Sequence, residues 1–358
     1  MYREHSIALV IPAYNEAKLI RPTLENVPSL FDRVFVVDDA SPDNQNEVIQ
    51  DCKKTDPRIE LISHSKSQGP GGAIISGYRQ SGKEGYDITV VIGGDYQMDL
   101  SEVENFLDPI VEGRADYTKG NRFLPVNIDE TIRRMPRLRL FANWVITALT
   151  KIASGFFSVA DVVDGYTAIS LKAVQIVNWD NAWKRYGYPM DFLVRLNAYG
   201  FRVLDVPRTA IYIEGERQSQ IKGISYALKV SPMLLRSFLW RLRFRYLYLD
   251  FHPLVVFYAL GSLMFGLSVI GGGFLVVDKI AFGGMNVTAS RAVLVSLLFV
   301  SGLQFLLFAM LFDREESKSN LQAYGSTYHK MKPLKSNLTP QREVEKSTAS
   351  EKENQHAS

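Results

Sequence analysis

The segment VFVVDDASPD, residues 34–43, is the clearest guide to the fold. Its first four residues are apolar and either branched or aromatic, which is typical of a buried strand. The run ends abruptly at Asp38 and Asp39, and Ser41-Pro42-Asp43 is a start signal for a helix that we expect to continue to about Lys54. A buried strand followed closely by a helix is the repeating unit of an α/β fold.

The same alternation extends to both sides of this segment. Further strands are expected at the apolar runs 7–11, 59–62 and 88–92. Helices are expected at 16–26 and after the glycine-rich loop 68–72, continuing to about Ser81. Weaker patterns predict strands at 117–120 and 203–206 and an amphipathic helix at 138–153. Alternating strands and helices predict a mostly parallel sheet, and such sheets bind ligands at the carboxyl ends of their strands.

Bulk properties narrow the class of protein. The 358 residues suffice for one large α/β domain with appendages. A net charge of only +3 gives no indication of a nucleic-acid binder. The single cysteine, Cys52, cannot form an internal disulfide, which favours a reducing compartment. The apolar run near the start is too interrupted for a secretory signal, so we expect a cytoplasmic amino-terminal domain.

The last third of the chain carries two long charge-free runs, at 251–277 and 292–312. Each is long enough to cross a hydrocarbon core of roughly 30 Å, which predicts a transmembrane hairpin, with buried core helices as the alternative. The preceding segment 228–249 mixes arginines with leucines and aromatic residues, a pattern typical of a helix in the membrane interface. Basic residues flank the hairpin, whereas the loop inside it has only Lys279 and Arg291, so both chain ends are expected in the cytoplasm.

Acidic residues follow two of the expected strands. Asp38 and Asp39 are candidates for hydrogen bonds to a nucleotide base or ribose, with helix capping by Asp39 or Asp43 as the alternative. Asp95 and Gln97, in GGDYQMD at 93–99, offer a carboxylate and an amide oxygen to a hard divalent cation that phosphate oxygens complete. The alternative there is a turn with a satisfied aspartate.

The glycine-rich and basic segments are less specific. Ile74 stands where a dinucleotide-binding motif has its third glycine, and Glu84 follows Gly82-Lys83, so no Walker site is present in the sequence. Arginines at 122, 133, 134, 137 and 139 and the basic segment 216–222 are candidates for phosphate recognition. A solvated or lipid-facing basic surface is the alternative for most of them.

The order of these motifs is more specific than any one of them. The matching stretches are VIPAYNE (10–16), VVDDASPD (36–43), GPGGAIISGY (69–78), GGDYQMD (93–99), GNRF (120–123), MPRLRLFAN (135–143), DVVDGYTAIS (161–170) and GERQSQIK (215–222). In these stretches the chain resembles the GT-A-fold family 2 glycosyltransferases, and within them the polyprenyl-phosphate (dolichyl-phosphate) mannose and glucose synthases. The resemblance covers almost all of residues 6 to 225 and implies an α/β fold with a Rossmann-like, mostly parallel sheet.

The resemblance also implies roles for individual residues. The nucleotide would be bound by Pro12, Tyr14, Glu16, Asp38, Asp39 and Asp95. Asp95 and Gln97 would bind Mg²⁺ or Mn²⁺, although this chain has Gly93 where the family usually has a first aspartate. The acceptor phosphate would contact Arg122, Arg139, Asn143 and Ser219, and catalysis would depend on Asp95, Arg122, Arg217 and Lys222. Asp161 and the segment 164–166 would line the middle of the site.

The implied activity is inverting transfer of a hexose from a nucleotide-sugar, GDP-mannose or UDP-glucose, to dolichyl or polyprenyl phosphate at a cell membrane or an endoplasmic-reticulum-type membrane. UDP-N-acetylglucosamine is a further possible donor. The expected divisions are a catalytic domain at 1–225, interface helices at 226–250, the hairpin within 251–312 and a polar tail at 313–358. A family 2 enzyme with a glycan or polysaccharide acceptor and an inactive membrane scaffold stay open as alternatives. A processive synthase would need more spans and a Gln-x-x-Arg-Trp motif that the sequence lacks.

Overall fold

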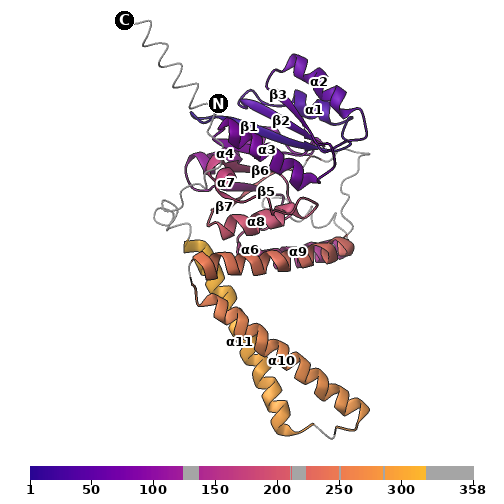
Figure 1. The fold of residues 1–358 in the computed structure, drawn as a ribbon, viewed down its shortest axis with the longest axis vertical. Coiled ribbons are helices and arrows are strands. Elements are labelled where there is room, and N and C mark those ends of the chain that lie inside the picture. Colours follow the sequence, from indigo (N-terminus) through magenta and orange to yellow (C-terminus); the bar gives the residue numbers. More distant parts are fainter. Residues whose placement is uncertain (124–136, 210, 212–222, 250, 285–286, 320–358) are drawn as a thin grey trace, which may run out of the picture. The chain divides into compact units, whose positions relative to one another are not determined.

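A computed structural model describes residues 1–123, 137–209, 211, 223–249, 251–284 and 287–319. Within these residues the chain divides into two compact units, one up to Ser237 and one from Phe238 onward. The first unit contains the α/β sheet, and the second contains two long apolar helices (Figure 1).

Seven strands in the described part of the first unit form one sheet, in the order β3-β2-β1-β4-β6-β5-β7. The strands are β1 (Ile7–Ala13), β2 (Arg33–Asp38), β3 (Ile59–Ser63), β4 (Ile88–Val91), β5 (Tyr117–Asn121), β6 (Thr167–Ser170) and β7 (Val203–Pro207). Strand β6 runs antiparallel to β4 and β5, and all other neighbouring pairs are parallel. Strands β1 and β4 are apolar and buried almost throughout, as expected of strands covered on both faces.

Helices cover both faces of this sheet. Side chains from α1 (Ile20–Glu25), α2 (Gln45–Thr55) and α4 (Val103–Val111) form one apolar core with β1, β2 and β4. Helix α3 (Pro70–Glu84) packs on β1 and β2, where Gly77 lies against Val10. The remaining helices of this unit are α6 (Arg137–Ser154), α7 (Leu171–Ile176), α8 (Tyr188–Ala198) and the first part of α9 (Gly223–Arg243). The expected α/β class with a mostly parallel sheet is confirmed.

Two elements begin at other residues than expected. Helix α1 begins at Ile20 and not at Glu16. The N–H groups of Glu16 and Ala17 donate instead to the side chains of Gln45 and Asp43. Helix α3 begins at Pro70, directly after Gly69 at φ 91°, so the glycine-rich segment forms the first turn of the helix and not only the loop before it.

The second unit is a helical hairpin (Figure 1). Helix α9 ends at Arg243 and a π-helical turn follows at Phe244–Leu249; α10 (Leu254–Ala281) and α11 (Ala289–Ser319) then pack on each other. Both long helices are apolar enough to cross a membrane, and only 22% and 11% of their most apolar windows are buried inside the protein. Such exposure does not fit the alternative of buried core helices.

One buried ion pair joins the two ends of the hairpin unit. Arg241 donates from Nη1 and Nη2 to the two carboxylate oxygens of Asp313, at 2.8 and 2.6 Å. Tyr246 Oη donates to the same carboxylate at 2.8 Å, and neither charged side chain is exposed. The end of α9 is therefore fastened to the end of α11 by paired, dehydrated charges.

Candidate active site

A cavity of about 510 Å³ lies outside the carboxyl ends of β1 and β4. The strand order reverses between these two strands, which is where open α/β sheets bind ligands. The lining residues come from the ends of β1, β2 and β4, from the turn into α3, and from two later segments of the chain: Pro12, Ala13, Tyr14, Glu16, Asp39, Ser67, Gly69, Pro70, Ala73, Val91, Ile92, Gly93, Gly94, Asp95, Met98, Val163, Gly165, Arg185, Tyr186 and Tyr188. Five of the six expected nucleotide-binding residues are among them.

The sixth, Asp38, supports the site from behind. It does not line the cavity; its carboxylate accepts from the Ser41 N–H (3.2 Å), from Gln45 Nε2 (2.7 Å) and from Asn46 Nδ2 (3.2 Å). Helix α2 has Asn44 as its N-cap, without a side-chain cap. Capping of this helix by Asp39 or Asp43 is therefore excluded.

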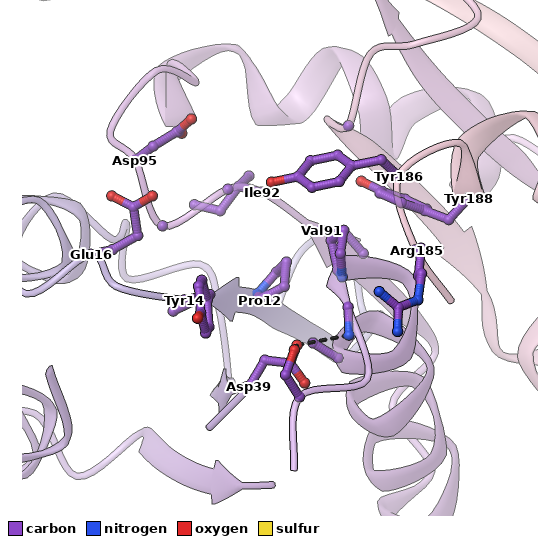
Figure 2. Close-up of a pocket in the computed structure, with 18 of the residues that line it drawn as sticks. Pro12, Tyr14, Glu16, Asp39, Val91, Ile92, Asp95, Arg185, Tyr186 and Tyr188 are labelled. Atoms are coloured by element: carbon purple, nitrogen blue, oxygen red, sulfur yellow. Dashed lines mark hydrogen bonds between the residues drawn. The ribbon is translucent and has the colours of Figure 1, made fainter. Parts of the chain in front are cut away.

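Asp39 is buried at the end of β2 and accepts four hydrogen bonds. Oδ1 accepts from His64 Nδ1 (2.7 Å) and the Gln68 N–H (2.8 Å), and Oδ2 accepts from Ser67 Oγ (2.8 Å) and the Gly69 N–H (2.7 Å). Burial alone would raise the pKa of Asp39, but these donors, led by the Gln68 N–H, hold it below its ordinary value. The ionised carboxylate thereby fixes the turn that leads into α3 (Figure 2).

Asp95 differs from Asp39 because one of its oxygens lacks a partner. Oδ1 is buried and has no hydrogen bond within the described part of the chain. Burial raises the pKa of Asp95, and the N–H of Gln97 opposes this shift only in part. Asp95 lines the cavity, and a carboxylate oxygen without a protein partner fits a divalent cation, which would supply that partner.

Gly93 and Gln97 lie two residues before and two residues after Asp95. A Cβ at position 93 would lie 2.8 Å from Asp95 Oδ1, so the absent side chain leaves room for the carboxylate. Gln97 does not line the cavity; its backbone carbonyl accepts from Arg208 Nη1 (3.3 Å) and from the Ile211 N–H (3.2 Å). Among the described residues, no group of three or more His, Cys, Asp or Glu side chains surrounds a possible metal position.

Arg122 lies in a buried cluster of charges. Its Nε is 2.7 Å from Asp161 Oδ2 and 3.2 Å from Asp164 Oδ2, and Arg208 pairs with Asp164 at 2.7 Å. Lys119 donates to the Asp164 carbonyl and is fully buried, and this burial lowers the pKa of Lys119. The structure thus brings Arg122, Asp161 and Asp164 together, and the side chain of Arg122 is still 29% exposed.

The other expected acceptor and catalytic residues are harder to place. Asn143 is half-buried in α6, and Arg139 lies in the first turn of the same helix, with its side chain outside the described residues. Arg217, Ser219 and Lys222 also lie outside the described residues. Their roles stay predictions.

Sequence reasoning missed one wall of the cavity. Arg185, Tyr186 and Tyr188 come from the segment between α7 and the first turn of α8, and in Figure 2 they lie across the view from Asp95 and Glu16. No strand end precedes them, so the rule that locates ligands at strand ends did not point to this segment. The only signal was the aromatic and basic run WKRYGY at 183–188.

Comparisons with known proteins identify the family of the sheet-containing unit. Residues 8–176 match the family model for Glycosyl transferase family 2. Residues 8–176 are therefore a family 2 glycosyltransferase domain. Among solved structures, glucosyl-3-phosphoglycerate synthase from Mycobacterium tuberculosis with Mn²⁺ and UDP-glucose aligns over 66% of this chain and 79% of its own, with a TM-score of 0.49 and 17% identity.

Several curated relatives cover more than half of the chain, among them three enzymes of lipid-linked sugars. The UDP-N-acetylglucosamine–dolichyl-phosphate N-acetylglucosaminyltransferase of Methanococcus voltae is 26% identical over 58% of this chain and 86% of its own length. The undecaprenyl-phosphate mannosyltransferase of Micrococcus luteus is 27% identical over 61% and 88%. The polyprenol monophosphomannose synthase of Mycolicibacterium smegmatis is 27% identical over 56% and 76%.

Proposed function

We propose that this protein transfers a hexose from a nucleotide-sugar to dolichyl or polyprenyl phosphate at the cytoplasmic face of a membrane. Each of the three relatives is named for a sugar and a polyprenol-type lipid. GDP-mannose and UDP-glucose are the leading donors. UDP-N-acetylglucosamine is a third candidate, since one relative is named for it.

The observation that carries this proposal is the cavity at the β1–β4 crevice, which is lined by Asp39 and by Asp95, whose Oδ1 has no partner among the described residues. Asp95, with Gln97 beside it, would hold Mg²⁺ or Mn²⁺, and the donor diphosphate would complete the shell. The bound cation would neutralise charge on the leaving diphosphate. Because Gly93 contributes no oxygen, phosphate and water would supply more of the shell than in relatives with an aspartate there.

The acceptor explains why no protein base is needed. A phosphate monoester has a second pKa of about 6, so the lipid phosphate is largely ionised at neutral pH. One of its oxygens would attack the anomeric carbon in line, the bond from that carbon to the diphosphate oxygen would break, and the configuration would invert. Arg122, Arg139, Asn143 and Ser219 would position the acceptor, and Arg217 and Lys222 would stabilise the leaving diphosphate.

The hairpin suits a lipid acceptor. Helices α10 and α11 would anchor the chain in the bilayer, and the arginine-rich end of α9 would lie among the headgroups. The distribution of basic residues supports an orientation with both chain ends in the cytoplasm. The site would then stand beside the surface at which a lipid phosphate is exposed.

The test is a transfer assay with purified protein, a polyprenyl phosphate and a panel of labelled nucleotide-sugars, with and without Mg²⁺ or Mn²⁺. A metal-dependent lipid product from one donor would support the proposal and identify the sugar. Nucleotide binding without a lipid product would overturn the lipid acceptor. With glycan or protein acceptors added in place of the lipid, a labelled product would then indicate a different acceptor, and no product at all would indicate a scaffold.

A further inference from the structure

The charges around the cavity do not balance for the proposed donor. Glu16, Asp39 and Asp95 contribute three carboxylates to the lining. A nucleoside diphosphate sugar is itself an anion, so its binding requires positive charge nearby. Among the described residues that line the cavity, Arg185 is the one arginine or lysine.

Arg185 is also available to a ligand. Its guanidinium makes no hydrogen bond or ion pair to any residue in the described part of the chain; only its backbone carbonyl is used, accepting from the Tyr188 N–H at 3.1 Å. By contrast, Arg195 and Arg208 are paired with Asp191 and Asp164. An arginine that lines a cavity without a protein partner leaves its fork of donors for a ligand.

The segment that carries Arg185 is held firmly against the turn into α3. The Gly72 N–H donates to the Lys184 carbonyl at 3.2 Å. A Cβ at Gly69 would lie 2.6 Å from the Lys184 carbonyl oxygen, and a Cβ at Gly71 would lie 2.6 Å from that of Trp183. The glycine-rich segment, which matched no phosphate-binding motif, is therefore needed for the close approach of the segment at 183–188.

Asp191 fastens the other side of this segment. Its Oδ2 accepts from the Trp183 N–H and from Arg195 Nε, both at 2.8 Å, and its Oδ1 accepts from Ser237 Oγ at 2.7 Å. The aspartate is buried at the start of α8. Asp191 thus holds the segment at 183–188 against α8 and α9, and it fixes the position of the backbone that carries Arg185.

We propose that Arg185 is a donor-binding residue that contacts the phosphate oxygens of the nucleoside diphosphate, and that Asp191 is the residue that positions it. This assignment rests on the proposed function, because it takes a nucleotide-sugar as the ligand. The planar guanidinium pairs with two phosphate oxygens at once, which a lysine cannot do.

The experiment is calorimetric binding of uridine, UMP and UDP and of guanosine, GMP and GDP to the full-length protein in detergent, with Mg²⁺ present throughout. The variants are Arg185→Gln and Arg185→Lys, with Arg114→Gln as the control, since Arg114 is exposed and pairs with Glu112 away from the cavity. We expect Arg185→Gln to weaken diphosphate binding by about 10- to 100-fold and to leave nucleoside binding unchanged. Arg185→Lys should recover part of the loss, and Arg114→Gln should match the wild type.

Three other outcomes of the binding experiment would each overturn one part of the proposal. An equal loss for nucleoside and diphosphate would place the contact on the base and overturn the phosphate assignment. Unchanged diphosphate binding would overturn any role of Arg185. A wild-type protein that binds no nucleotide would overturn the proposed function itself.

The positioning role has its own readout. We expect the wild-type protein to bind the diphosphate at least about tenfold more tightly than the nucleoside. In Asp191→Asn, we expect this ratio of affinities to fall toward its value in Arg185→Gln, while the nucleoside still binds. The double variant should then lose little more than Arg185→Gln alone. A uniform loss for nucleoside and diphosphate in Asp191→Asn would show a merely structural role and overturn the positioning assignment.

Discussion

The absence of a side chain at Gly93 affects where the carboxylate of Asp95 can lie. A Cβ at position 93 would lie 2.8 Å from Asp95 Oδ1, well inside normal contact distance. The atom it meets is the end of a side chain that can rotate away, so the fold would tolerate the change but the carboxylate would move. Glycine at position 93, where the family usually has an aspartate, is thus compatible with the position that the Asp95 carboxylate occupies.

Gly93→Asp should therefore not improve the enzyme. We expect the variant to fold with unchanged melting temperature but to lose at least about tenfold in transfer rate, because Asp95 is displaced and a second carboxylate repels the diphosphate. Transfer rate and thermal unfolding, measured on the same preparation, check this. A faster enzyme would show that the site lacks a metal ligand at position 93.

Asp95→Ala tests the metal position directly. We expect transfer to fall by at least about 100-fold while the protein still folds and inserts, since the change removes a charge stabiliser and no hydrogen bond from the described residues to Oδ1. Lipid-product formation with the preferred donor is the measurement. A variant that keeps near-normal turnover would refute the assignment of Asp95 to the metal.

Asp39 is expected to contribute to the stability of the fold as well as to nucleotide binding. Its pKa is lowered in the folded chain, so its ionised form stabilises the fold above the ordinary pKa of about 3.9, and this contribution is lost as the pH falls through the lower folded value. We expect Asp39→Asn to reduce the free energy of unfolding by about 2 kcal/mol at pH 7 and by progressively less as the pH falls below the ordinary pKa of about 3.9. Denaturant unfolding at neutral and acid pH measures the difference, and a pH-independent loss would contradict the charge argument.

At the scale of elements, strands β1, β2 and β4 could be predicted from the sequence, whereas β6 and the segment at 183–188 could not. Strands β1, β2 and β4 are short apolar runs with polar residues at their ends, and these patterns located Asp39 and Asp95 correctly. Strand β6 is antiparallel and only four residues long, and its sequence TAIS begins and ends with polar residues, so no apolar run marks it. The wall at 183–188 is positioned by contacts distant in sequence, and local patterns do not report such contacts.

Helix α3 shows what close packing between elements requires. A Cβ at Gly77 would lie 2.3 Å from Val10 Cγ1, in the middle of β1. We expect Gly77→Ala to lower the free energy of unfolding by about 1–3 kcal/mol through overpacking, despite the better helix propensity of alanine. Gly113→Ala is unsuitable as a control because Gly113 has φ 67°. Gly266→Ala, which meets nothing within 4 Å, is the matched control, and a stabilised Gly77→Ala protein would contradict the packing argument.

At the scale of the whole molecule, the proposed membrane topology can be tested by asking which side of the membrane each exposed residue faces. The proposed topology predicts opposite accessibility of Ser29 and Phe282, both exposed, at the α1–β2 turn and after α10. The natural Cys52 is buried, and with Cys52→Ala a single new cysteine can be followed alone. We expect Ser29→Cys to react with an impermeant maleimide only from the cytoplasmic side, and Phe282→Cys only from the opposite side.

Sealed vesicles of both orientations provide that measurement. The Cys52→Ala protein without a new cysteine is the control for background labelling. Labelling of both positions from the same side would show that the hairpin does not cross the bilayer.

The pair between Arg241 and Asp313 has a consequence for how the protein is made. The two residues are 72 positions apart, with α10 and most of α11 between them. During synthesis Arg241 therefore emerges long before its partner exists, and its charge must stay hydrated until the second long helix has been threaded and has returned. Removing Asp313 would leave a dehydrated arginine unmatched, a defect worth about 3–5 kcal/mol. We expect the pair to act as a proofreading point of biogenesis, at which chains with an incomplete hairpin stay open to degradation.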